Sequence, residues 1–120
     1  MLISLGAIIG ANLRYFVAQH VAKLIPSSFP YGTLIINISA SFILGLFLIW
    51  TTERVLVDPR WRLLMATGFC ATYSTYSSYA FETFALFEKH QWLVAGLNIL
   101  ATNVVCFAAV MLGAIVARSL

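Results

Sequence analysis

The sequence predicts an all-α membrane protein with four transmembrane helices. Of its 120 residues, 62% are apolar and only 9% are charged, whereas a soluble domain carries roughly 25% charged residues. The apolar residues also gather in four long stretches that short polar segments separate. The net charge of +3 comes from scattered groups that form no basic stripe, so the sequence indicates a lipid bilayer as partner and no nucleic acid.

Each apolar stretch is long enough to cross a bilayer, which takes about 20 residues. The predicted spans are 2–22, 33–50, 61–87 and 92–117, which together make one four-helix transmembrane domain. Trp50, Trp61 and Trp92 fall at predicted span ends, where amphipathic rings prefer the membrane interface. We expect the first stretch to be retained, because no small-residue cleavage site follows it. An even number of spans puts both termini on one side, and the arginine bias favours the cytoplasm only weakly.

Eight consecutive residues, 72–79, carry a hydroxyl group in the middle of the third span. Lipid does not tolerate so many hydroxyls, so we expect this hydroxyl band to face protein, water or an ion. Ser and Thr compete for backbone hydrogen bonds, and Gly68 weakens the helix nearby. The third helix is therefore predicted to break near mid-membrane, which frees carbonyl oxygens that suit a cation.

Further polar residues lie inside the other spans, and each has two interpretations. Asn37 is either a clamp between helices or a hydrogen-bond donor to an anion. Arg14 either reaches to the interface or makes a vestibule electropositive. Glu82 is either a structural cap or a proton carrier.

On the fourth span, one face carries Asn98, Thr102 and Cys106, which either line a channel or bond to another helix; Asn103 is expected to point elsewhere. Small residues along the first, second and fourth spans predict close helix packing, either within one subunit or in an oligomer, most simply a dimer. No nucleophile adjoins His20 or His90, and no phosphate-binding loop or metal-spaced cluster is present. We therefore expect no enzyme.

Over essentially its whole length the chain resembles the Fluc/CrcB family of fluoride channels. The resemblance rests on residues 10–15, 32–37, 67–69 and 74–79, followed by Glu82, Thr102, Cys106 and Gly113. It implies an antiparallel dimer in the cell (plasma) membrane, a multi-pass protein through which fluoride passively leaves the cytoplasm. It also implies a central structural sodium ion, held by the backbone carbonyls of Ala71 and Ser74.

The same resemblance implies the ion pathway. Fluoride would pass Asn37 and the rings of Tyr76 and Tyr79. The polar track would include Thr75, Thr102 and Cys106, with Arg14 near a vestibule.

Three departures from the family pattern leave alternatives open. Ala71 and Thr72 replace a Gly-Gly pair, Tyr76 and Tyr79 replace phenylalanines, and Cys106 replaces a serine. Similar departures occur in paired members of the family, so both a homodimer and a heterodimer with a related subunit remain open. The alternative functions are a small multidrug-resistance-type, proton-coupled exporter that uses Glu82, and a non-conducting partner subunit.

Overall fold

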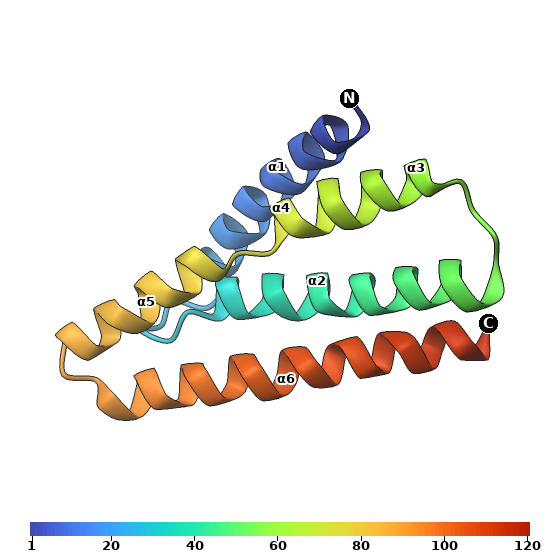
Figure 1. The fold of residues 1–120 in the computed structure, drawn as a ribbon. Coiled ribbons are helices and arrows are strands. Elements are labelled where there is room, and N and C mark those ends of the chain that lie inside the picture. The colour runs from blue at the N-terminus through green and yellow to red at the C-terminus, as the bar shows by residue number, and fades with distance from the viewer.

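The computed structural model describes residues 1–120, and its regular structure is entirely helical (Figure 1). Four helical segments follow one another, so the predicted all-α class is confirmed. In chain order the elements are α1 (Leu2–Leu24), α2 (Tyr31–Ile49), η1 (Trp50–Arg54), α3 (Pro59–Arg62), η2 (Leu63–Cys70), α4 (Ala71–Tyr73), α5 (Tyr76–Glu88) and α6 (Trp92–Ser119). The π-helical η1 continues α2. The third segment runs from α3 through the π-helical η2 and α4, and resumes as α5 after the predicted break.

Three of the segments are long and apolar enough to cross a membrane: Leu2–Leu24, Tyr31–Arg54 and Trp92–Ser119. The break divides the remaining segment into two shorter helical pieces. How this segment crosses the bilayer, and where each span ends in the membrane, stay predictions.

Local sequence explains where the third segment starts and ends. Asp58 caps α3 by accepting the backbone N–H of Arg60 at 2.9 Å, with Pro59 at the first helical position. At the other end, His90 takes the left-handed conformation with φ of 59°. The N–H groups of His90 and Gln91 donate to the carbonyls of Phe87 and Leu86, which closes α5 with a Schellman motif.

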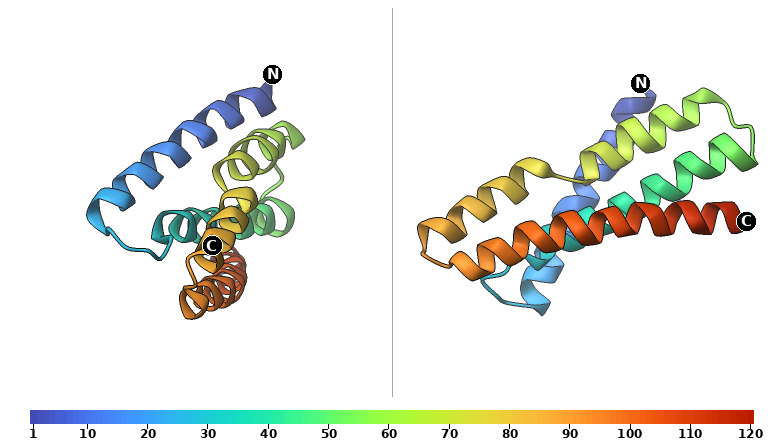
Figure 2. Two further views of the ribbon diagram at one scale, coloured as in Figure 1. Left: turned by 90° about the vertical axis from the view of Figure 1, so that its left-hand side faces the viewer. Right: turned by 60° about the horizontal axis from the view of Figure 1, so that its bottom comes forward.

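Two helix pairs hold the subunit together: α2 packs along α6, and α1 packs along η2 (Figures 1 and 2). Both contacts need glycine, because a Cβ on Gly113 would meet the backbone of Phe42 and Leu46, and a Cβ on Gly68 would meet that of Ile3. A Cβ on Gly96 of α6 would meet nothing within 4 Å. Gly113 and Gly68 therefore serve helix packing within the chain, whereas Gly96 faces open space.

Little of the chain is buried: 19 of 120 residues lie in the interior. The core cluster consists of Ile36, Ala40 and Tyr73, with Phe69 stacked on Tyr73 at a ring distance of 5.5 Å. Large apolar side chains cover much of the outside, particularly on α1 and α6. Such a surface suits contact with lipid or with another subunit.

Candidate functional site

The break in the third segment consists of two extended residues, Ser74 and Thr75, between α4 and α5 (Figure 1). Thr75 caps α5, since its Oγ1 accepts the N–H of Ser78 at 3.2 Å. The Ser74 hydroxyl donates back to the carbonyl of Cys70 at 3.0 Å. The Thr75 hydroxyl thus satisfies a backbone N–H that a continuous helix would pair internally, whereas the Cys70 carbonyl also keeps its helical bond from the Ser74 N–H at 3.0 Å.

Asn37 on α2 binds the backbone of the break from the side. Its Nδ2 donates to the carbonyl of Thr75 at 3.1 Å, and its Oδ1 accepts the N–H of Thr75 at 2.9 Å. These two bonds match the first interpretation of Asn37, in which its side chain clamps one helix to another. They also leave one N–H of the amide free to donate to a ligand, because an amide nitrogen carries two hydrogens.

The clamp changes the hydrogen bonding of the carbonyls before the break. In a continuous helix the N–H of Thr75 would donate to the carbonyl of Ala71, but here it donates to Asn37. The carbonyls of Ala71 and Ser74 accept no hydrogen bond. Both residues line a cavity of about 110 Å³ with Ala40 and Ser41. Free carbonyl oxygens beside a cavity are suitable ligands for a hard cation.

A larger groove of about 420 Å³ opens between α2, the break and α6. It brings together nearly all the residues of the predicted ion pathway: Asn37, Thr75, Tyr76, Tyr79, Thr102 and Cys106. Ser41, Ser74, Asn103, Phe107 and Val110 complete its lining. The groove therefore presents hydroxyl and amide groups beside aromatic rings, with no charged side chain on its wall.

The expectation that Asn103 points elsewhere is wrong. Asn103 lines the groove beside Thr102, and its Nδ2 donates to the carbonyl of Ile99 at 2.8 Å and lies 3.5 Å from the hydroxyl of Tyr79. Asn98 instead lies buried outside the groove, where its Nδ2 donates to Thr83 at 2.9 Å. Asn103, Cys106 and Val110 are spaced three or four residues apart, which places them on one face of α6. This spacing could have predicted that Asn103 lines the groove.

Arg14 lies apart from these residues. It is half-buried on α1 and belongs to the lining of neither the groove nor the carbonyl cavity. The structure of one chain therefore does not bring Arg14 to the other predicted pathway residues.

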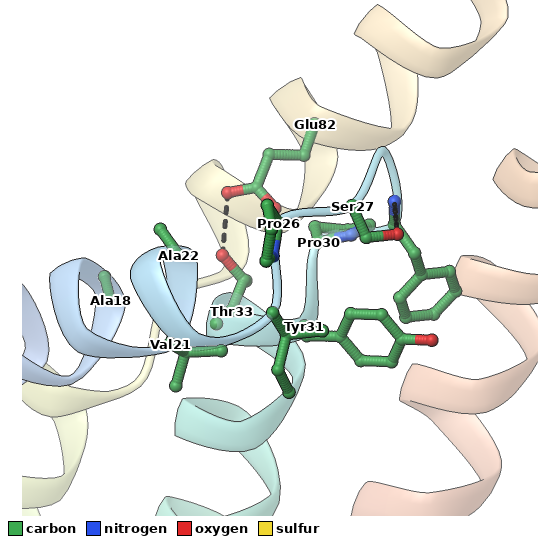
Figure 3. Close-up of a pocket in the computed structure, with 12 residues that line it drawn as sticks. Ala18, Val21, Ala22, Pro26, Ser27, Pro30, Tyr31, Thr33 and Glu82 are labelled. Carbon is green, nitrogen blue, oxygen red and sulfur yellow. Dashed lines mark hydrogen bonds between the residues drawn. The ribbon is translucent and has the colours of Figure 1, made fainter.

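Glu82 occupies a separate cavity of about 250 Å³ between the end of α1, the α1–α2 turn and α5 (Figure 3). The hydroxyl of Thr33 donates to its Oε1 at 2.7 Å (Figure 3), while Oε2 is buried without a hydrogen-bond partner. The carboxylate thus joins α5 to the start of α2 and does not line the central groove.

The hydroxyl band itself divides between two environments. Tyr73, Thr75 and Tyr79 are buried, and the Tyr73 hydroxyl lies 2.9 Å from Ser39 Oγ. Tyr76 is 78% exposed, and Ser77 is exposed as well. Within the single chain, protein thus covers part of the band; that the rest faces protein, water or an ion stays a prediction.

Comparison with known proteins gives consistent matches over nearly the whole chain. The family model described as CrcB-like protein, Camphor Resistance (CrcB), matches residues 1–114. A relative from Koribacter versatilis, named fluoride-specific ion channel FluC, is 52% identical over 118 residues, which cover 98% of this chain and 94% of the relative. A relative of the same name from Roseiflexus sp. is 44% identical, and the match covers 98% of this chain and 95% of the relative. Another from Sulfurihydrogenibium sp. is 40% identical, and the match covers 100% of this chain and 97% of the relative.

Proposed function

The chain belongs to the CrcB family, and on that premise we propose that it is a subunit of a passive, fluoride-selective channel in the cell membrane. The family is one of ion channels, so the prediction that the chain is not an enzyme is confirmed. The observation that carries the proposal is the groove, where hydroxyl and amide groups from α2, the break, α5 and α6 converge. Fluoride is a small anion that accepts hydrogen bonds, and these groups donate them.

Two of these donors, on Asn37 and Thr75, have a geometric reason to be available. One N–H of Asn37 remains free after the clamp forms. The Thr75 oxygen accepts the N–H of Ser78 and lies 3.4 Å from Ser77 Oγ, where either oxygen can donate; with Ser77 as donor, the Thr75 O–H is left for the groove. No Lys or Arg lines the wall, which avoids a single tight anion site and favours the weak, successive binding that conduction requires.

A dimer is the second part of the proposal. The groove lies on the surface of one chain, and Tyr76 and Ser77 beside it are exposed. Gly96 on α6 leaves room for close approach of another helix. An antiparallel partner subunit, either a second copy or a related chain, would enclose the groove and cover these groups.

The third part is a structural sodium ion at the dimer centre. The carbonyl oxygens of Ala71 and Ser74 would hold it, and the fit is favourable because neither oxygen accepts a hydrogen bond. When bound, the ion would neutralise the partial negative charges of carbonyls brought together from two subunits. Replacing sodium with N-methyl-D-glucamine should lower the melting temperature of the purified dimer. An unchanged melting temperature would argue against the ion while leaving the channel proposal intact.

No observation favours proton-coupled multidrug export. Such exchange needs a carboxylate in a central binding chamber, whereas Glu82 is bonded to Thr33 in a cavity away from the groove. Flux by the chain alone would distinguish a conducting subunit from a non-conducting partner subunit.

Flux from liposomes tests the proposal. Liposomes containing the purified chain and loaded with both anions should lose fluoride rapidly and chloride hardly at all, as measured with ion-selective electrodes. Flux by the chain alone would favour a homodimer. Flux only after co-expression with a related subunit would favour a heterodimer, and no fluoride flux in either case would contradict the proposal.

A further inference from the structure

A further cleft is lined by residues at the start of α1 and at the start of the third segment, which lie at the same end of the molecule (Figure 1). Its volume is about 400 Å³, and its lining consists of Leu2, Asp58, Arg60, Trp61 and Leu64. None of these residues belongs to the groove or to the carbonyl cavity. The cleft is therefore independent of the proposed ion pathway.

Arg60 differs from the other arginines at this end of the chain. Arg54 donates to the carbonyl of Leu120 at 3.2 Å, Arg62 donates to Leu48 and Thr52, and Arg118 forms an ion pair with Glu53 at 2.9 Å. The guanidinium of Arg60 makes no hydrogen bond or ion pair, and the residue is exposed at the cleft.

Asp58 does not neutralise this charge through an ion pair. Its Oδ1 accepts the backbone N–H of Arg60, which fixes the carboxylate as the cap of α3. The arginines of this end also outnumber its acids, Glu53 and Asp58. The mouth of the cleft consequently presents an available positive charge.

The remaining wall is apolar. Trp61 is 56% exposed, and Leu2 and Leu64 are half-buried beside it. Tryptophan prefers the boundary between headgroups and acyl chains, and a free arginine at that depth attracts phosphate. We propose that this cleft binds an anionic glycerophospholipid, with its phosphate on Arg60 and an acyl chain along Trp61, Leu2 and Leu64. Charge complementarity selects this occupant, because a phosphate supplies the negative charge that Arg60 lacks, whereas a parallel second copy would bring the same positive charge to this end.

Lipid titration of the detergent-purified full-length protein in its native oligomeric state tests the proposal. Phosphatidylglycerol should raise the melting temperature and remain bound in native mass spectrometry, whereas phosphatidylcholine with the same acyl chains should do neither. Arg60→Gln should weaken phosphatidylglycerol binding about fivefold, which is what one basic residue contributes near an anionic surface. Arg60→Lys keeps the charge and should retain most of the binding.

Arg54→Gln is the matched control, because it removes the same charge from the same end of the molecule but outside the cleft. It should leave phosphatidylglycerol binding close to that of the unsubstituted protein. An equal loss in both variants would overturn the proposal in favour of diffuse surface electrostatics. Equal binding of the two lipids, or efficient disulfide cross-linking between subunits through Arg60→Cys, would overturn it as well.

Discussion

Asn37 and Thr75 form a reciprocal pair of hydrogen bonds across the break in the third segment, at 3.1 and 2.9 Å. The side-chain amide takes the place of a backbone partner for both polar groups of Thr75. Because the N–H of Thr75 is engaged there, the carbonyl of Ala71 loses its helical donor. A single side chain on α2 thus binds the backbone at the break and leaves the carbonyl of Ala71 without its helical donor.

Removing this clamp should affect both stability and flux. Asn37→Ala leaves the N–H and C=O of buried Thr75 without their partner, which should cost about 1–3 kcal/mol. We expect a lower melting temperature and strongly reduced fluoride efflux from liposomes. Asn12→Ala is the control, since Asn12 is exposed and bonds only to Ile8 on its own helix. An Asn37→Ala protein with unchanged stability and flux would show that the clamp is dispensable.

Cys106 offers a chemical test of the groove. Its side chain is half-buried on the groove wall, whereas Cys70 is only 3% exposed. Methyl methanethiosulfonate should react with the Cys106 thiol, place extra bulk in the pathway and reduce fluoride efflux. Cys106→Ser should conduct and resist the reagent, while Cys70→Ser should remain sensitive. Inhibition that persists in Cys106→Ser would place the reactive group elsewhere.

Gly113 and Gly96 lie on the same helix but should respond differently to an added methyl group. The Cβ of alanine at 113 would come within 2.7 Å of the amide nitrogen of Leu46, whereas at 96 it would meet nothing within 4 Å. Gly113→Ala should push α2 and α6 apart and cost about 1–3 kcal/mol. Gly96→Ala should leave the subunit fold intact or stabilise α6 by up to about 1 kcal/mol. Thermal unfolding by circular dichroism measures both; a Gly113→Ala protein as stable as the unsubstituted one would contradict the packing of α2 on α6.

Replacing His90 with glycine should stabilise the protein. Its φ of 59° costs a side-chain-bearing residue about 1–2 kcal/mol, which glycine avoids. His90→Gly should therefore raise the melting temperature without disturbing the Schellman motif that ends α5. His20→Gly is the opposite control: it lies within α1, where glycine costs about 1 kcal/mol. A lower melting temperature for His90→Gly would mean that the imidazole makes a stabilising contact in the assembled protein.

Composition and the length of the apolar stretches were enough to predict the fold class, and the hydroxyl run beside Gly68 predicted the break. The apolar stretches correspond to helices, and the run of hydroxyl groups from 72 to 79 contains the two extended residues. The sequence pattern alone did not identify most of the predicted pathway residues. They were inferred from the family resemblance. Asn103 was assigned to the wrong face, because neighbouring positions on a helix can both border a wide groove.

The sequence by itself determined the helical membrane class, since long unbroken apolar stretches satisfy their backbone in lipid as helices, whereas strands of a membrane barrel alternate apolar and polar residues. Only the tertiary structure decided the roles of individual polar residues. It paired Asn37 with Thr75 and Glu82 with Thr33, and it left Arg60 free while the neighbouring arginines found partners. These pairings join residues far apart in the chain, and the crossing of helices sets the distances between them; helical periodicity specifies only which face each residue occupies.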